Sequence, residues 1–382
     1  MSDVRHIAFV TETFAPEING VAMTLGRLVD GLLGRGYRIN IFRPRQSREE
    51  QARINGHFAE HLFPGMQVPM YRDLRFGFPA GRRLLKTWQQ HPPDAVYIAT
   101  EGPLGWSAVS AAQKLGLPTL SGFHTNFHTY SRHYRLSLLE PLILGYLRNL
   151  HRRTGCTLVP TVSLAAQLRD QAFGCVEVLQ RGVDTALFNP GRRDENLRRQ
   201  WSVAPDQLVC LYVGRIAAEK NILAAVHAFR AIQKHTPDAR LVLVGDGPLR
   251  TSLARDNPDF VFCGMRRGEE LARHYAGGDL FLFPSRTETF GNVVTEAMAS
   301  GLAVAAYNLA AAGEHIRDGE TGALAVHEDE AAFVERAVAL SLDPVRLRQI
   351  GHDAAAHAAA LGWDGIVSQF IQLLERQIRG KA

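Results

Sequence analysis

The stretch LVCLYVGRIAAEKN, residues 208–221, decides the fold. LVCLYVG is a short apolar run, which is typical of a strand buried on both faces of a sheet. A turn that carries Arg215 and Lys220 follows it, and a helical stretch comes next. A buried strand that leads through a polar turn into a helix is the unit of a parallel α/β sheet.

The same unit recurs along the chain, which predicts an α/β protein with two doubly wound sheets. Helical stretches such as Val21–Gly34 and Leu104–Lys114 separate the strands. In the first half the expected strands are Ile7–Thr11, Arg38–Phe42, Ala95–Ala99, Thr119–Gly122, Thr157–Val159 and Val176–Leu179. In the second half they are Leu208–Gly214, Arg240–Gly247, Phe260–Gly264, Asp279–Ser285 and Leu302–Tyr307.

A chain of 382 residues is too long for one ordinary core and suits two domains. The segment Leu187–Arg199 is polar and carries proline and glycine, so we expect the linker there. The first domain is then expected at 1–188 and the second at 189–362. Residues 363–382 are expected to form a closing helix, because apolar positions recur at helical spacing from Trp363 to Arg379.

The net charge of +5 admits a nucleic acid, an anionic lipid or an anionic small substrate as partner, or only a basic solvated surface. No apolar run reaches the ~18 residues of a membrane span, and no secretory signal opens the chain. The four cysteines form no CxxC, so we expect buried thiols in a reducing compartment and a cytoplasmic protein. The cysteines are Cys156, Cys175, Cys210 and Cys263.

Ligands of open α/β sheets bind beyond the carboxyl ends of the strands, so the loops there are the candidate sites. Asn19-Gly20 follows the first strand, and glycine lets amides at a helix start approach an anion, although a plain turn and cap explains the pair better. His124 follows the strand that ends at Gly122 and suits a hydrogen bond to a sugar hydroxyl, or a structural role. No GxGxxG follows the first strand and no GxxxxGK[ST] occurs, which disfavours a nicotinamide dehydrogenase and a P-loop NTPase.

Arg215 and Lys220 flank the turn of the opening stretch. Two cations and the amides of a helix start could neutralise a diphosphate without a metal, although surface pairs of this kind are common. The segment SRTETFGNVVTEAMASG, residues 285–301, is the strongest signal. Glu288 and Glu296 are expected to bind the vicinal hydroxyls of sugars, and the amides of Gly291–Val294 suit a phosphate.

Together these residues resemble the family 4 retaining glycosyltransferases, which have the GT-B fold. The resemblance covers nearly the whole chain, and the order and spacing of its markers are specific. The markers are Asn19-Gly20, His124 in FHTNF, RGVDTALFNP (Arg181–Pro190), GRIAAEKN (Gly214–Asn221), the E-x7-E from Glu288 to Glu296, and AAGEHIRDGETGALA (Ala311–Ala325).

The resemblance implies two Rossmann-like domains that face a central cleft, with acceptor binding at 1–188 and nucleotide-sugar binding at 189–362. The closing helix would cross back to the first domain. The catalytic set would be His124, Arg215, Lys220 and Glu288. Gly20, Arg215 and Lys220 would contact the donor diphosphate, and Glu296 the ribose. Glu288 would hold the hexose with the amides of Phe290 and Gly291. Asn292 and Val293 would complete the donor site. The segment that contains Met265 and Arg266 would run past the nucleobase. No metal or cofactor is expected, and no DxD occurs.

The function so implied is transfer of a hexosyl group, with retention, from GDP-mannose or a UDP-hexose to an acceptor hydroxyl. Front-face attack would pass the proton to the leaving diphosphate. Arg266 only donates hydrogen bonds, which leans away from guanine if it faces the base. The alternatives are an epimerase or hydrolase of nucleotide sugars, or a non-catalytic nucleotide-sugar binder. Nucleic-acid binding is disfavoured, because the arginine clusters lie among leucines rather than stacking aromatics.

The acceptor is expected to be a membrane lipid such as diacylglycerol or a phosphoinositide, with a soluble or polysaccharide acceptor as the alternative. FHTNFHTYSRHY (123–134) and GMRRGEELARHYAGGDLF (264–281) resemble the sulfoquinovosyl- and mannosyl-diacylglycerol-type enzymes. Residues 130–153 mix leucines and tyrosines between arginines, so this stretch suits either an anionic headgroup region or a core helix with charged ends. The expected location is the inner face of the plasma membrane. The acceptor and membrane residues would be Arg72, Arg75, Tyr130, Tyr134 and Arg135.

We predict that Glu296→Ala or Lys220→Ala abolishes hexosyl transfer while the fold survives. Removing Lys220 takes away a cation that would neutralise the leaving diphosphate, and removing Glu296 takes away the hydrogen bonds to the ribose. Product formation by each purified variant, with circular dichroism as the folding control, measures this. Full activity in either variant would refute the site.

Overall fold

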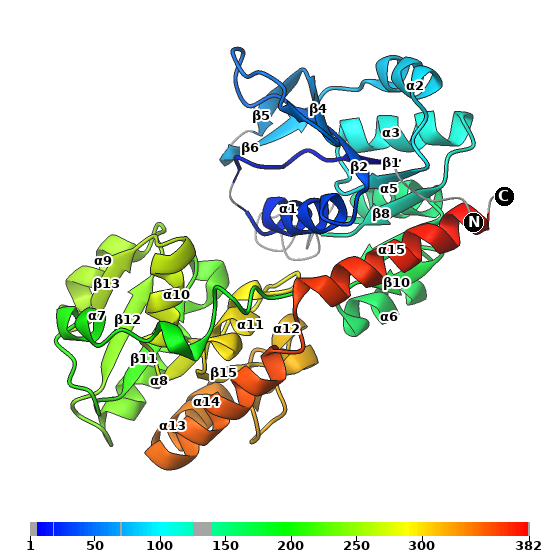
Figure 1. The fold of residues 1–382 in the computed structure, drawn as a ribbon. Helices are drawn as coiled ribbons and strands as arrows, with labels where there is room; N and C mark the ends of the chain where they lie inside the picture. Colours follow the sequence, from blue (N-terminus) through cyan, green and yellow to red (C-terminus); the bar gives the residue numbers. More distant parts are fainter. Residues whose placement is uncertain (1–5, 18, 69–70, 125–139, 381–382) are drawn as a thin grey trace. The chain divides into compact units, whose positions relative to one another are not determined.

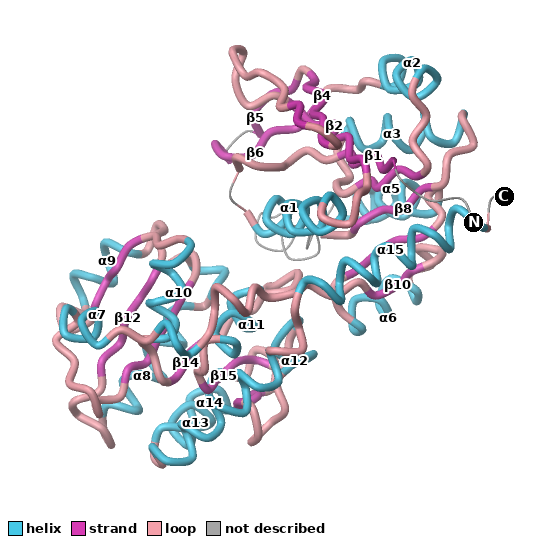
Figure 2. Tube along the Cα trace, viewed as in Figure 1, coloured by secondary structure: helices cyan, strands magenta, loops and turns pink. Residues whose placement is uncertain are grey.

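The computed structural model describes residues 6–17, 19–68, 71–124 and 140–380. It divides into two compact units, Met1–Arg181 with Trp363–Ala382, and Gly182–Gly362 (Figure 1). Figure 2 shows that each unit has strands at its centre and helices around them. Within the described ranges, every helix is too short or too polar to cross a lipid bilayer.

The first unit is built on a largely parallel eight-stranded sheet with the order β10-β9-β8-β7-β1-β2-β4-β3. Only the short β3 runs antiparallel to its neighbour, and β5 pairs with β6 in a separate antiparallel hairpin. The strands are β1 (His6–Val10), β2 (Arg38–Pro44), β3 (Ile54–Asn55), β4 (Phe58–Phe63), β5 (Gly65–Val68), β6 (Tyr71–Gly77), β7 (Ala95–Ile98), β8 (Thr119–Gly122), β9 (Cys156–Val159) and β10 (Val176–Val178). The helices are α1 (Gly20–Leu33), α2 (Gly81–Gln90), α3 (Pro103–Lys114), α5 (Glu140–Arg152), α6 (Val162–Asp170) and α15 (Trp363–Arg379).

Alternation along β1 explains the layers of the first unit. Ile7 and Phe9 belong to the core shared with α1 and α15, whereas Ala8 and Val10 belong to the core on the other face with α2 and α3. The closing helix α15 packs tightly on α1, since a Cβ added at Gly31 would overlap the side chain of Val367. Helix α15 therefore helps to cover the first sheet although it ends the sequence (Figure 1).

The second unit has a six-stranded parallel sheet with the order β13-β12-β11-β14-β15-β16. Its strands are β11 (Val209–Val213), β12 (Arg240–Val244), β13 (Val261–Gly264), β14 (Leu280–Phe283), β15 (Ala303–Tyr307) and β16 (Gly322–Ala325). Its helices are η2 (Pro190–Arg192), α7 (Glu195–Gln200), η3 (Ala218–Lys220), α8 (Ile222–Gln233), α9 (Arg250–Asp256), α10 (Gly268–Ala276), α11 (Asn292–Ala299), α12 (Ala310–His315), α13 (Glu330–Ser341) and α14 (Pro344–Ala358).

Each sheet has a point at which the strand order reverses. In the second unit the chain runs from β11 outward through β12 to β13 and then returns to the other side of β11 with β14. In the first unit β1 has the same position between β2 and β7. The crossovers on the two sides of such a point leave in opposite directions, so the strand ends open a crevice there.

The doubly wound α/β fold is confirmed, and two details differ from expectation. The strand β16 and the strands at residues 54–77 were not expected, since their sequences lack a clear apolar run. The boundary between the units along the chain lies between Arg181 and Gly182 rather than at residue 188. Residues after 181 join the second unit because Val183 N donates to Leu361 O at 2.8 Å and the ring of Phe188 packs on Tyr275.

The expectation of four free thiols is wrong for two of the cysteines. Cys156 and Cys175 form a disulfide, with their Cα atoms 4.7 Å apart. They lie side by side because Thr157 of β9 is in register with Val176 of β10. Cys210 and Cys263 remain as free thiols. The cysteines therefore give no support to a reducing compartment.

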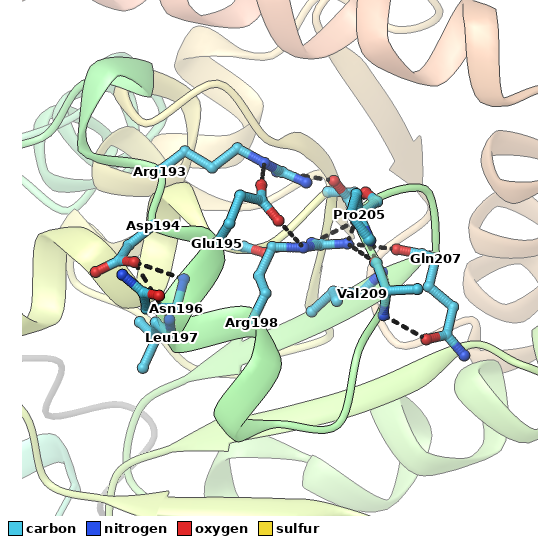
Figure 3. A network of polar contacts seen from close by, with 12 residues as sticks. Arg193, Asp194, Glu195, Asn196, Leu197, Arg198, Pro205, Gln207 and Val209 are labelled. Atoms are coloured by element: carbon cyan, nitrogen blue, oxygen red, sulfur yellow. Dashed lines mark hydrogen bonds and ion pairs between the residues drawn. The ribbon is translucent and has the colours of Figure 1, made fainter.

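Arg198 of α7 is a fully buried cation that ties α7 to the loop before β14 (Figure 3). Its guanidinium donates to Gln207 O at 2.6 Å and to Gly277 O at 2.7 Å. It also pairs with Asp279 at 3.3 Å. The carboxylate of Asp279 in turn accepts from Val209 N at 2.8 Å, so one network fixes the starts of β11 and β14.

We predict that Arg198→Met lowers the melting temperature of the second unit by roughly 6–20 °C. Methionine fills much of the volume but leaves buried carbonyls and Asp279 without their donor, and breaking a buried pair costs about 3–5 kcal/mol. Differential scanning calorimetry measures the shift. Arg199→Met, an exposed neighbour on the same helix, is the control and should change the melting temperature little. Equal shifts in the two variants would contradict the role of Arg198.

Candidate functional site

Two loops beside the reversal point of the second sheet meet through an ion pair. Lys220 ends η3 in the loop after β11, and Glu288 lies in the loop after β14. Lys220 Nζ lies 2.5 Å from Glu288 Oε1 and also donates to Thr287 O at 3.5 Å. Both side chains are mostly buried, with 23% and 14% of their surfaces exposed. A cation and a carboxylate thus lie together at the predicted crevice.

Close backbone packing shapes the loop that carries Lys220. A Cβ at Gly245 would overlap the carbonyl of Gly214, and φ is +138° at Gly245, so the ends of β11 and β12 approach as only glycine allows. The hydroxyl of Tyr212 donates to Arg215 O at 3.0 Å. Asn221 has φ +52° and begins α8 directly after Lys220. These constraints hold the backbone of the loop in one conformation.

Contacts between Phe290 and helix α12 anchor the loop that carries Glu288. The ring of Phe290 is buried and packs edge-on against His315 at 5.8 Å, while Phe290 O accepts from Ala311 N at 2.7 Å. Gly291 adopts φ +88° and precedes α11, whose first turn has no capping side chain. The amides of Asn292 and Val293 therefore stay available for an anion at the positive end of the helix.

Glu296 lies on α11 with its carboxyl buried beside Tyr275 of α10. Tyr275 OH donates to Glu296 Oε2 at 2.9 Å. Burial raises the pKa of Glu296 to about 7, and the hydrogen bond from Tyr275 offsets only part of that rise. The carboxylate form can accept hydrogen bonds from two adjacent hydroxyls, so the residue is suited to a diol ligand.

Three other predicted donor residues are exposed or pair with other groups. The guanidinium of Arg215 is 58% exposed and pairs with Glu219 at 3.0 Å. Met265 is 61% exposed. Arg266 pairs with Glu270 at 3.5 Å and lines a cavity of about 400 Å³ with Trp201 and His274. The side chain of Arg266 is therefore engaged away from the ion pair.

The first unit gathers a second group at the carboxyl ends of its strands. His124 Nε2 shares a hydrogen bond of 3.0 Å with Tyr97 OH. Burial, aided by the charge of Arg181, lowers the pKa of His124 to about 3, so the ring is neutral at neutral pH. A Cβ at Gly20 would lie 3.5 Å from Arg181 Nη1. Gly20, His124 and Arg181 are thus neighbours.

Sequence patterns missed the individual roles of three residues near these groups. Arg181 was noticed only as part of a motif, and Tyr275 has a spacing that points to nothing but a helix. Glu12 follows β1, and burial raises its pKa to about 7 while its carboxyl accepts from Gly77 N and Leu104 N. No local pattern marks a carboxylate that binds backbone donors from two distant segments.

Of the predicted acceptor residues, only the side chain of Arg75 lies in the described part of the chain. Arg75 donates to Gln46 O at 2.8 Å, which places it beside the loop after β2. Arg72 is in β6, but its side chain is outside the described part, as are Tyr130, Tyr134 and Arg135. In the part of the chain that is described, no three His, Cys, Asp or Glu side chains are grouped to hold a metal. That the reaction needs no metal stays a prediction.

Comparison with known sequences identifies the family. The Glycosyltransferase Family 4 profile matches residues 18–187, and the Glycosyl transferases group 1 profile matches residues 207–343. A GDP-mannose-dependent alpha-mannosyltransferase of Mycolicibacterium smegmatis is 35% identical over 304 residues, which is 78% of this chain and 79% of that protein. The chain is a family 4 glycosyltransferase.

One more distant relative and one solved structure extend the comparison. The alpha-monoglucosyldiacylglycerol synthase of Streptococcus pneumoniae is 27% identical over 85% of this chain and 76% of that protein. The structure of sucrose-phosphate synthase from Thermosynechococcus elongatus aligns with a TM-score of 0.78 at 20% identity, over 99% of this chain and 100% of that chain. The GT-B fold of this hexosyltransferase is thereby confirmed.

We predict that Glu296→Gln stabilises the glycosyltransferase at pH 8 while it impairs catalysis. Folding raises the pKa of Glu296 from its ordinary value near 4.5 to about 7. Ionisation of Glu296 therefore lowers the free energy of unfolding as the pH rises above 4.5, and this cost is complete above pH 7. The neutral amide removes this cost and can still accept from Tyr275. The gain in melting temperature should shrink as the pH falls through 7 and vanish near pH 4. Differential scanning fluorimetry across this range measures it.

Glu335→Gln is the control, because Glu335 is exposed on α13. It should show no gain at any pH. A gain for Glu296→Gln that is the same at pH 4 and pH 8 would contradict the buried charge as its cause.

Proposed function

We propose that this enzyme transfers a mannosyl group from GDP-mannose, with retention of configuration, to a hydroxyl of a membrane lipid. The Lys220–Glu288 pair carries the proposal, because it sets a phosphate-binding cation beside a hydroxyl-binding carboxylate at the end of β11 and β14. The donor assignment is supported by the 35% identity to a GDP-mannose-dependent enzyme. A UDP-hexose is the other donor that this site chemistry admits.

Arg266 no longer disfavours guanine as the donor base. A donor-only side chain would oppose guanine only if it faced the base. Its guanidinium pairs with Glu270 and lines the cavity beside Trp201. The base is then free to contact the backbone of residues 264–266, whose carbonyls can accept from guanine.

Each group of residues at the site would have its own role during transfer. Lys220, Arg215 and the first amides of α11 would neutralise the diphosphate as the bond to the anomeric carbon breaks. The acceptor oxygen would attack from the same face, and its proton would pass to the leaving diphosphate oxygen. Glu288 would orient the hexose and Glu296 the ribose. With cations and amides placed for the leaving charge, the proposed reaction needs no metal.

A relative that acts on a lipid and the charge of the chain support a lipid acceptor and a membrane location. The diacylglycerol-glucosylating relative is 27% identical over most of this chain. The chain is basic overall, with a net charge of +5, which suits an anionic surface. We therefore place the enzyme at the inner face of the plasma membrane as a peripheral protein, with diacylglycerol or a phosphoinositide as acceptor.

We predict that Glu288→Gln weakens binding of GDP-mannose at least tenfold but leaves binding of GDP unchanged or tighter. The carboxylate would contact only the hexose, and its loss frees Lys220 for phosphate. Isothermal titration calorimetry with both ligands measures this, and Glu296→Gln is the comparison, because it should weaken both. Equal weakening of GDP and GDP-mannose by Glu288→Gln would contradict the hexose contact. Release of mannose at an undiminished rate without lipid would show a hydrolase instead.

A further inference from the structure

Helix α5 presents one face to the core and the other to solvent. Leu147 and Leu150 are buried, with 1% and 0% of their surfaces exposed. On the other face Leu142 is 71% exposed, whereas Tyr146 is 38% exposed, stacks on the ring of Trp106 at 5.1 Å and donates from its hydroxyl to Glu101 O at 2.6 Å. The helix is therefore more than a core element, because it leaves the apolar side chain of Leu142 uncovered in its first half.

A cavity of about 280 Å³ lies on the second half of this helix. Its lining residues are three or four positions apart, so they share one side of α5 and of the turn at Arg153 that follows it. Three of them are arginines and none is acidic. The lining is Gly145, Arg148, Asn149, Arg152 and Arg153.

Arg153 is held in place by uncharged partners. Its guanidinium donates to Gln113 Oε1 at 2.8 and 3.0 Å and to Ser110 Oγ at 3.1 Å. It also lies 5.0 Å from the ring centroid of Trp106. These contacts fix the direction of the guanidinium, and none of them, among the described residues, compensates its positive charge.

Arg148 and Arg152 add two more positive charges at the same cavity. Within the described ranges no recorded ion pair joins either of them to a carboxylate, and residues 125–139 contain no Asp or Glu. The dipole of α5 favours Arg152, which is in its last turn. It does not explain why three guanidinium groups surround one open space, where like charges repel unless an anion lies between them.

We propose that this cavity binds the phosphate group of an anionic phospholipid. Planar guanidinium groups donate paired hydrogen bonds to phosphate oxygens, and Asn149 can add a further donor. A Cβ at Gly145 would meet no atom within 4 Å, so the glycine keeps the space open. The site is distinct from the Lys220 and Glu288 site, which belongs to the other unit.

The exposed Leu142 of α5 indicates the source of the phosphate. Leu142 lies three residues before Gly145, so it continues the cavity side of the helix toward its start. A phosphate that carries acyl chains would let Leu142 enter the lipid region while the arginines hold the headgroup. In this choice of a lipid over free phosphate, the inference rests on the proposed membrane acceptor.

Vesicle flotation tests the site with the full-length protein. We compare phosphatidylcholine vesicles with and without about 30% phosphatidylglycerol, because each basic residue near an anionic surface contributes to binding. The double variant Arg148→Gln/Arg152→Gln should bind the anionic vesicles at least tenfold more weakly than the wild type. Lys234→Gln/Arg348→Gln removes the same charge from exposed positions of the second unit and should change binding less than twofold.

A second variant separates a formed pocket from diffuse charge. Gly145→Leu fills the cavity and keeps every arginine, so it should also weaken binding at least tenfold, whereas diffuse attraction would leave it unchanged. Normal binding by Gly145→Leu, or equal losses in both double variants, would overturn the proposal. Calorimetric binding of inorganic phosphate that the arginine variant loses, with vesicle binding intact, would overturn the lipid source.

Failure of the proposed reaction is recognised separately. Transfer to an acceptor in detergent micelles should continue in all three variants, because none of their residues lies in the donor site. If the wild type transfers no mannose but the vesicle results hold, the reaction is wrong and the lipid site stands.

Discussion

The parallel pairing of β11 with β14 is the constraint on which the rest of the second unit depends. Leu211 is in register with Phe281, 70 positions later in the chain, and the strand order reverses there. That reversal places the loop after β11 beside the loop after β14. Lys220 and Glu288 meet for this reason alone, and the buried network of Arg198 and Asp279 sets the starts of the same two strands.

Burial tunes the charges that this arrangement brings together. Glu296 loses hydration on α11 and its pKa rises, while His124 in the other unit is kept neutral by burial and by the charge of Arg181. A fold selected only for stability would not bury an ionisable carboxyl with one hydrogen-bonding partner. Such groups are concentrated at functional sites, where the ligand supplies the missing contacts.

Much of the fold was predictable because buried parallel strands leave a strong local signal. The start of every strand expected from the sequence lies within one residue of its position in the structure, and α15 has its expected bounds. The hairpin of β5 and β6 and the edge strand β16 lack that signal. The disulfide was missed because 19 residues separate Cys156 from Cys175, and only the pairing of β9 with β10 makes them neighbours. The domain boundary moved to Arg181, since Val183 bonds to a segment that closes the second unit almost 180 residues later.

The sequence by itself determined which chemical groups the site contains, because strand, turn and helix are local patterns and the residues after each strand can be named from them. It thereby placed Lys220 and Glu288 in loops after strands and Glu296 one turn into a helix. Only the tertiary structure decided which of these groups touch, what Tyr275 and Tyr97 do, and that Arg148, Arg152 and Arg153 line one cavity at the end of α5. Contacts between segments far apart in the chain follow from sheet order and packing, and neither leaves a mark in local sequence.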